Sequence, residues 1–269
     1  MSEYHTLRPR QLVQKRAHLP VAYIGLGILE WHGLHNPLGL DGLKANGIAS
    51  YLAGKVGGVV MPPLYWGDNR NEICELVFDP SVSPWLPPGT EDHTQLISEH
   101  MGIDKSSFQQ DAARSTAEGG WQLWERLMVH TLFQIETLGF SMIVPIPGHY
   151  PLFGPLNRAI ESYKTLAGSA HIFVLKDSMF SPEGDAGDHA AAFETSLMMA
   201  IQPDLVCIEE LGDDLSRPNI GVLGRDPRVE ASREFGQKIL TRFEELIRGE
   251  IHQRLGQSAP SHQTTVWNE

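Results

Sequence analysis

The stretch from Pro20 to Val56, "PVAYIGLGILEWHGLHNPLGLDGLKANGIASYLAGKV", contains three segments of different character. Its first nine residues form an apolar run that is typical of a buried strand. Its last sixteen residues place apolar side chains at helical spacing, with Asp41 at or near the N-cap. The loop between them carries Glu30 and His32. The stretch therefore predicts a strand, a polar loop and a helix in succession.

The same alternation continues along the chain. Further strands are predicted at 57–67, 141–148, 171–177 and 204–211, and further helices at 117–140, 151–166, 188–203 and about 228–255. Strands separated by helices indicate βαβ units, and hence an α/β fold with a mostly parallel sheet covered by helices on both faces. We expect one domain over residues 1–269, with a long proline-rich loop insertion at 68–115 and a polar tail at 256–269.

Composition narrows the functional classes. The chain of 269 residues carries a net charge of -12, which disfavours nucleic acid as a partner. No apolar run approaches the roughly 20 residues that a membrane span requires, and the N-terminus has no secretory signal. Cys74 and Cys207 stand far apart, which argues against a disulfide framework and against a thiolate zinc site. We expect a cytoplasmic protein, without membrane or nucleic-acid partners, that acts on a small molecule.

Residues that can bind metal follow the predicted strands. They are Glu30, His32 and Asp41 after the first strand, His149 after the strand at 141–148, and His189 and Glu194 at the start of the helix at 188–203. Carboxyl ends of parallel strands meet at one edge of a sheet, so these side chains would converge there. Carboxylates and imidazoles without thiolates favour zinc, manganese or iron. Two ions bridged by a carboxylate could use the whole set, with Asp41 as the candidate bridge.

The alternative interpretation is an ordinary polar loop. A single histidine after a strand is more often a loop or core residue than a ligand. Glu194 could likewise be an ordinary helix residue, and the stretch "EWHGLH" differs from the helical HExxH zinc motif because its glycine and following proline oppose a helix. The placement of three clusters at strand ends favours a metal site, but this pattern leaves both interpretations open.

Three ordered motifs carry a resemblance to a known family. "LEWHGLHNPLGLD", "GHY" after an apolar strand and "DHAAAFETS" resemble the three motifs of the creatininase family, over a region from Pro20 to about Pro203. The resemblance implies a three-layer α/β/α sandwich, a site for two divalent metal ions and a homo-oligomer, typically a hexamer. It implies that the metal ligands are Glu30, His32, Asp41, His149 and Glu194.

The resemblance also implies a mechanism. A metal-bound hydroxide would attack a carbonyl carbon of a small cyclic substrate, and His189 would transfer a proton to the leaving group, with Glu194 as a second catalytic residue. The sequence departs from the family pattern at Pro147, where an asparagine is usual, and at Pro151, where creatininase has a metal-binding glutamate. We therefore expect that the metal core is kept and that the substrate wall differs.

The expected substrate follows from these departures. "EWHGLHNPLGLDGLKA" and "PPLYWGDNR" look more like the family branch that opens 3-dehydro-scyllo-inosose, a cyclic polyol ketone of inositol catabolism, than like creatininase. The expected substrate-binding residues are His35, Tyr65, Trp66, Asp68, Asn69, Arg70 and Tyr150. One alternative is an amidohydrolase of a creatinine-type cyclic amide or a formamide. Another is a metal- or ligand-binding protein of the same fold without catalytic turnover.

Overall fold

The computed structural model describes residues 2–79, 81, 86–176 and 188–256. At its centre lie four parallel strands in the order β2-β1-β3-β4. Their bounds are β1 Val21–Leu26, β2 Val59–Val60, β3 Met142–Pro147 and β4 His171–Ile172. The chain passes from β1 to β2 on one side and later to β3 on the other. The space between the ends of β1 and β3 is therefore the point at which the strand order reverses, the usual ligand position in open α/β sheets.

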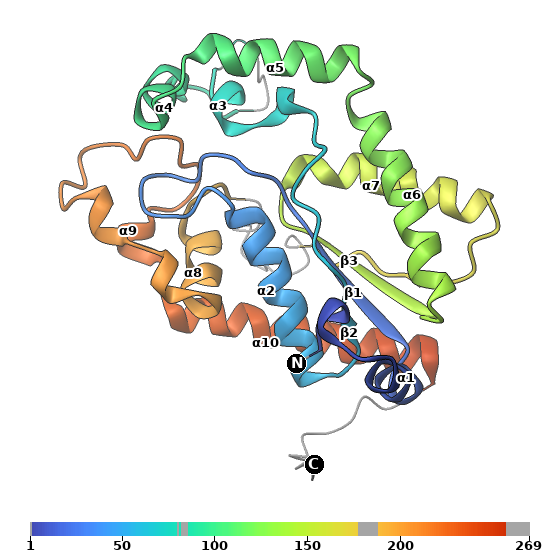
Figure 1. The fold of residues 1–269 in the computed structure, drawn as a ribbon. Coiled ribbons are helices and arrows are strands. Elements are labelled where there is room, and N and C mark those ends of the chain that lie inside the picture. Colours follow the sequence, from blue (N-terminus) through green and yellow to red (C-terminus); the bar gives the residue numbers. More distant parts are fainter. Residues whose placement is uncertain (1, 80, 82–85, 177–187, 257–269) are drawn as a thin grey trace.

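Helices cover both faces of this sheet (Figure 1). The helices longer than one turn are α1 Pro9–His18, α2 Leu40–Lys55, α4 Thr94–Met101, α5 Lys105–Ala117, α6 Trp121–Thr137, α7 Phe153–Thr165, α8 Ala192–Ile201 and α10 Arg233–Leu255. Shorter helices are η1 Tyr4–Thr6, η2 Arg70–Glu72, α3 Cys74–Val77, η3 Tyr150–Leu152, η5 Pro203–Leu205, η6 Ile208–Leu211 and α9 Pro227–Glu230. None of the helices in the described ranges has an apolar stretch long enough to cross a bilayer.

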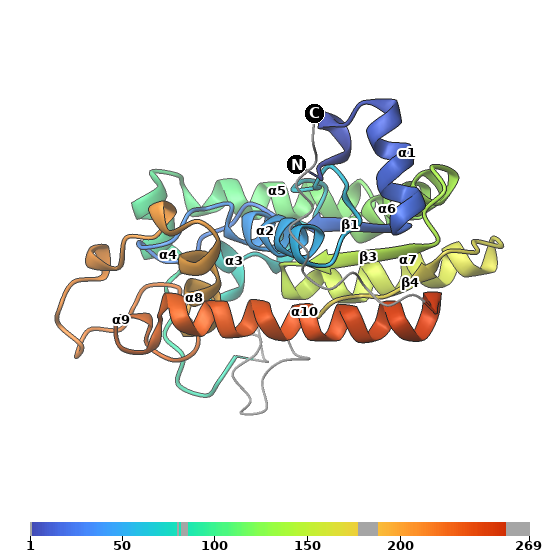
Figure 2. The same ribbon diagram turned by 90° about the horizontal axis from the view of Figure 1, so that it is seen from below.

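Alternate residues of the strands supply the two cores. Tyr23, Val144 and Ile146 face α2, α8 and α10, whereas Ile24 and Ile143 face α6 and α7. Because successive side chains of a strand point to opposite faces, fully buried strands such as β1 and β3 build both layers. Figure 2 shows α10 along one side of the molecule, with α8 against its N-terminal half. The predicted three-layer α/β/α arrangement is confirmed.

The strand at 171–177 is shorter than predicted, and prolines in β3 explain why. Phe173 and Leu175 still donate to the carbonyls of Ile143 and Pro145. The β3 positions that would donate back are Pro145 and Pro147, which have no N–H. Pairing therefore continues in one direction only, and regular β structure ends at Ile172. Asp177, the last residue of the predicted strand, lies outside the described residues.

Two other predictions of local structure are wrong. The strand predicted at 204–211 consists instead of η5 and η6, whose residues are half-buried or exposed, so this segment has no apolar layer against which a strand could pack. The region 68–115 is not mainly loop, because η2, α3, α4 and most of α5 lie within it. These helices gather beyond the end of β1 (Figure 1). Of the predicted tail, only Gly256 is described.

Candidate metal centre

The loop after β1 bends the chain so that Glu30 and His32 face the same space. Gly33 adopts a left-handed φ of 75°, and Glu30 N–H donates to the carbonyl of Leu38. α2 begins directly afterwards and places Asp41 in its first turn. His149 follows the end of β3, and α8 carries Glu194 in its first turn. All five of these side chains are almost fully buried.

Close backbone packing brings these segments together. A Cβ atom at Gly148 would overlap the carbonyl of Asp41, and one at Gly27 would overlap the backbone of Gly42. Only glycine allows the ends of β1 and β3 to approach the start of α2 so closely. The glycine before His149 is therefore part of the geometry that places this imidazole beside Asp41.

Asp41 lies between two histidines, one at each carboxylate oxygen. Its Oδ1 is 3.2 Å from Nε2 of His32, and its Oδ2 is 3.2 Å from Nδ1 of His149. Oε1 of Glu30 lies 2.8 Å from Nδ1 of His149, and Oε2 of Glu194 lies 3.7 Å from Nε2 of His32. This geometry allows one carboxylate to contact two ions, as a bridging ligand does.

In His32, His149 and His189, one ring nitrogen is hydrogen-bonded to a backbone carbonyl oxygen and the other faces the cluster of carboxylates. His32 Nδ1 contacts the carbonyl of Glu30, His149 Nε2 that of Glu72, and His189 Nε2 that of Trp31, at 3.1, 3.2 and 2.8 Å. A carbonyl only accepts, so in each ring the nitrogen on the carbonyl carries the proton. The second nitrogen faces the carboxylates, and when it is unprotonated its lone pair has the direction of that in a metal-ligating histidine.

The carboxylates are oriented in a similar way. Cys74 N–H donates to Oε2 of Glu30 at 2.8 Å, which leaves Oε1 towards the histidines. Lys44 Nζ lies 2.5 Å from Oε1 of Glu194, and Ala190 N–H donates to Oε2 at 2.8 Å. Asp188 accepts from the N–H groups of Phe193 and Glu194, which holds the first turn of α8 in place.

The donor set fits a divalent cation. Glu30 Oε1, His32 Nε2 and Asp41 Oδ2 are buried and have no hydrogen-bond partner among the described residues. Buried polar atoms normally have partners, and a metal ion would supply one. Three overlapping groups place their ligand atoms within 4.8 Å of one another: Glu30, Asp41 and His149; His32, Asp41 and Glu194; and Glu30, His32 and His189.

The pKa values of two histidines also indicate a site that favours positive charge. Burial alone would lower the pKa of His32, but Asp41, Glu194 and Glu30 outweigh it and raise this pKa to about 9. For His149, burial is likewise outweighed, mainly by Glu30 and Asp41, and its pKa lies well above the ordinary value. The carboxylates thus favour positive charge at this position, which protons or metal ions can supply.

His189 differs from the other two histidines. Its pKa is lowered by burial and by the neighbouring His32, so the neutral imidazole is favoured. Its side chain is 21% exposed, whereas that of His32 is fully buried. With Nε2 on the carbonyl of Trp31, the open nitrogen is Nδ1, which lies 3.8 Å from Glu30 Oε1. A neutral imidazole with one accessible nitrogen at the edge of the cluster can accept and return a proton.

The residues expected to bind substrate are more scattered. His35 is buried against Thr195, with Nε2 3.0 Å from its hydroxyl, and so supports the first turn of α8. Trp66 and Tyr150 are about two-thirds exposed, and Tyr65 packs over Gly42.

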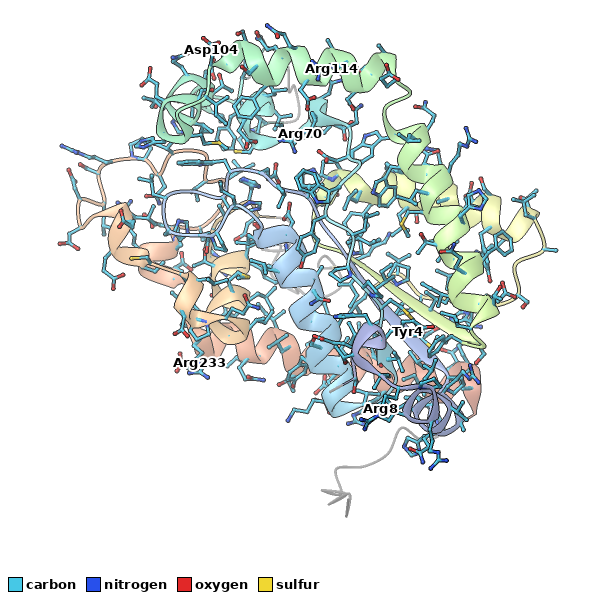
Figure 3. All side chains as sticks on the ribbon, viewed as in Figure 1. Tyr4, Arg8, Arg70, Asp104, Arg114 and Arg233 are labelled. Atoms are coloured by element: carbon cyan, nitrogen blue, oxygen red, sulfur yellow. The ribbon has the colours of Figure 1, made fainter. Side chains whose placement is uncertain are left out.

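Asp68, Asn69 and Arg70 bond mainly within the protein. Arg70 Nη1 lies 3.2 Å from Asp68 and donates to the carbonyl of Leu29 at 2.9 Å. Asn69 caps η2 by accepting from the N–H of Asn71. Figure 3 shows Arg70 between α5 and the rest of the molecule, so this residue braces the ligand loop from the side of the insertion.

Sequence reasoning missed three residues of the site. Lys44 lies one turn after Asp41 on a buried stripe of α2, and a lysine on an apolar stripe is the available signal. Glu75 is fully buried, and its Oε1 accepts from Trp31 N–H; the signal is an acidic residue inside the apolar run "ICELVF". Asp188 directly precedes His189, but its role depends on contacts that the sequence does not show.

Comparison with known proteins finds similar sequences and structures of the same fold. The sequence model of the creatininase family, described as creatinine amidohydrolase, matches residues 116–245. Creatinine amidohydrolase of Pseudomonas putida is 26% identical over 243 residues, which cover 82% of this chain and 84% of that protein. Among solved structures, a mutant creatininase described as "Zn-Zn type" covers 94% of this chain and 97% of its own at 20% identity, with a TM-score of 0.65. The structure titled "Creatininase Mn" covers 94% and 98% at 21% identity, with a TM-score of 0.63. In its ordered motifs, its three-layer fold and these matches, the chain is similar to members of the creatininase family.

Proposed function

We propose that this protein is a metal-dependent hydrolase that opens a small cyclic compound at a carbonyl group. The observation that supports this most strongly is the buried cluster in which Asp41 directs its two oxygens at His32 and His149. We further propose that Glu30, His32, Asp41, His149 and Glu194 hold two divalent ions, with Asp41 as the bridge. Zinc or manganese fits these donors, and the solved relatives include a "Zn-Zn type" and a manganese form.

When bound, divalent ions in such a site lower the pKa of water and stabilise negative charge on a carbonyl oxygen. The protein contributes orientation and proton transfer. Hydrogen bonds to Glu30 and Glu194 fix which carboxylate oxygen faces the cluster. His189 accepts a proton at Nδ1 and donates it to the leaving atom, while its Nε2–H bond to Trp31 keeps the ring in place.

For the substrate, we propose a cyclic polyol ketone such as 3-dehydro-scyllo-inosose. Pro151, which replaces a carboxylate usual in creatininase, and the "PPLYWGDNR" segment support it. A creatinine-type cyclic amide is the second candidate, because the Pseudomonas putida relative named creatinine amidohydrolase aligns with most of the chain. The internal bonding of Asp68 and Arg70 weakens their expected role in binding hydroxyl groups, so the polyol proposal does not depend on them.

The test measures metal content and hydrolysis together. Purified protein supplied with Mn²⁺ or Zn²⁺ is assayed with 3-dehydro-scyllo-inosose and with creatinine. Asp41→Ala is expected to lose bound metal and all turnover, whereas Asp204→Ala, an exposed aspartate of η5, keeps both. Ring opening of the diketone supports the first substrate, and turnover of creatinine alone supports the second. Bound metal without turnover of either compound would contradict both substrates.

A further inference from the structure

A cavity of about 430 Å³ lies beside the candidate metal centre. One wall comes from the 68–115 insertion, with Phe78, Thr90 and His93. The other comes from the segment 215–228, including Asn219 and Leu223. Its volume lies within the range of small-molecule sites. The residues expected from the sequence to bind substrate do not line it, and the proposed mechanism does not use it.

A row of rings connects this cavity with the metal centre. The ring centroid of Phe78 lies 5.6 Å from that of His93, in a stacked arrangement, and 6.4 Å from that of His189. His189 in turn lies 4.4 Å from the ring of His32. Phe78 is only 3% exposed, lines the cavity and lies next to the histidine proposed to transfer protons.

The surroundings of Phe78 are held by backbone hydrogen bonds. His189 and Leu223 exchange two of them, at 2.8 and 2.9 Å. Gly221 N–H donates to Nδ1 of His93 at 3.1 Å, which fixes the imidazole that stacks on Phe78. Both walls of the cavity are therefore tied to the segment that contacts His189.

The charged residues at the cavity are paired with one another or with neighbours. Arg228 binds Asp226 at 2.6 Å and donates to the carbonyls of Asp214 and Arg217. Arg217 lies 3.2 Å from Asp214. The lining thus combines an aromatic face, hydroxyl and amide groups, and charges that are already compensated. A lining of this kind suits an uncharged polar ring and gives a charged molecule no counter-ion.

We infer that this cavity is the substrate pocket, that it takes an uncharged polar ring, and that Phe78 is its specificity-determining wall beside His189. This inference rests on the proposed function, since it concerns the substrate of the same site. A ring bound in this cavity would pack beside Phe78, whose own ring lies 6.4 Å from that of His189. The insertion then acts as a substrate-recognition element, because it supplies Phe78 and His93.

The experiment measures binding separately from turnover. Protein supplied with Mn²⁺ is titrated by calorimetry with myo-inositol, with creatinine and with an amino-inositol, which carries one ammonium group on the same ring. At least one uncharged ring is expected to bind more tightly than the charged one. Phe78→Ala should weaken that binding about 10- to 100-fold, as the loss of one buried aromatic contact predicts.

Two further variants control for folding. Phe108→Ala removes another buried phenylalanine of the insertion, which packs against Ile73 and does not line the cavity, and should leave binding unchanged. Phe78→Leu keeps an apolar side chain and should bind the ring at an intermediate level. In any turnover assay, Phe78→Ala should raise KM and change kcat by less than about 3-fold, because the ring contact is not specific to the transition state.

The possible outcomes separate the two proposals. Ring binding that depends on Phe78, without hydrolysis of any compound, supports the pocket and contradicts the proposed function. Turnover with KM equal in Phe78→Ala and Phe108→Ala contradicts the pocket alone. Tighter binding of the amino-inositol, or binding of neither uncharged ring, also overturns the inference.

Discussion

The ion pair between Lys44 and Glu194 places a full positive charge in the interior of the protein. Lys44 is fully buried, and its Nζ lies 2.5 Å from Oε1 of Glu194. Taking two charges out of water costs several kcal/mol per ion, so such a pair is stable only while both partners are present. The charge of Lys44 also lowers the pKa of Glu194 against the opposing effect of burial.

Lys44→Met is therefore expected to destabilise the protein by about 3–5 kcal/mol, because it leaves the Glu194 carboxylate buried without this partner. The double variant Lys44→Met/Glu194→Gln should recover a substantial part of that loss. Urea unfolding of the metal-free single and double variants measures the coupling energy. Additive effects of the two substitutions would show that the pair does not contribute as a unit.

The positions of Glu30, His32, Asp41, His149, His189 and Glu194 could be predicted from the sequence because each lies beside a strand end or a helix start. The three residues that were missed contribute through contacts made after folding. Lys44 and Glu75 contribute to the site because of the side chains that surround them after folding. Asp188 contributes because its carboxylate accepts hydrogen bonds from two backbone N–H groups. Contacts between distant segments leave little trace in a single sequence.

At the scale of elements, α3 is a single turn with a large effect on the site. It directs the N–H of Cys74 at Glu30 and buries Glu75 beside it. Burial, together with the charge of Glu30, raises the pKa of Glu75 to about 7. When the pKa of a carboxyl group is higher in the folded than in the unfolded protein, the free energy of unfolding falls as the pH rises. For Glu75 this fall is expected between about pH 4.5 and 7.

Glu75→Gln is expected to stabilise the metal-free protein at pH 8 by about 2–3 kcal/mol and to have little effect at pH 4.5. The amide keeps the acceptor for Trp31 N–H and removes the buried charge. Chemical unfolding at the two pH values provides the comparison. Equal effects at both values would mean that the charge of Glu75 is compensated in the folded protein.

The contact between α8 and α10 depends on a glycine. A Cβ at Gly236 would overlap the carbonyl of Ser196, whereas a Cβ at Gly249, on the same helix, meets nothing within 4 Å. Gly236→Ala should lower the melting temperature by several degrees, corresponding to about 2 kcal/mol or more. Gly249→Ala should raise stability by about 0.5–1 kcal/mol, because alanine favours helix. Similar effects of the two substitutions would contradict the close approach.

The strands and long helices could be predicted because their apolar residues repeat with a clear period. α5 escaped this reasoning because it buries only Phe108 and Ala112 among thirteen residues, so its pattern resembles that of a polar loop. For the segment 204–211 the error is the reverse, because a regular strand was predicted where none forms. Its apolar residues suggested a strand, yet they are half-buried or exposed. The spacing of apolar residues indicates which side chains are buried. It therefore does not predict helices or strands reliably where few side chains are buried.

At the scale of the whole molecule, the proposed ligand set comes from segments far apart in the sequence. It requires the ends of β1 and β3 and the starts of α2 and α8 to be in place together. The unfolded chain has no such site, so a metal that binds the folded protein stabilises it. Protons compete for the same positions, since the carboxylates raise the pKa of both His32 and His149.

This competition predicts opposite pH dependences for the metal-free and metal-loaded protein. The folded pKa of His32 is about 9 and the ordinary value is 6.5, so its contribution to the metal-free fold is complete below pH 6.5 and is lost as the pH rises towards 9. The melting temperature of the metal-free protein should fall over this range, by an amount that corresponds to a few kcal/mol. The increase produced by saturating Zn²⁺ or Mn²⁺ should grow, because fewer protons must be displaced.

Calorimetric melting at pH 6, 7.5 and 9, with chelator and with added metal, gives the comparison. His32→Asn should flatten the profile of the metal-free protein, and His130→Asn, on the outer part of α6, should not. A metal-free protein that becomes more stable between pH 6.5 and 9 would contradict the electrostatic picture of the cluster.

The three histidines at the centre share a further property, since the partner of each is a carbonyl of the main chain, at Glu30, Trp31 or Glu72. Replacing the side chain at any of these positions leaves the carbonyl where it is. The path of the backbone therefore fixes which nitrogen of each imidazole carries the proton that faces the main chain, whereas the charge of His32 and His149 depends on the neighbouring carboxylates. Side chains around the centre can therefore change without altering which nitrogen of each ring faces the carboxylates.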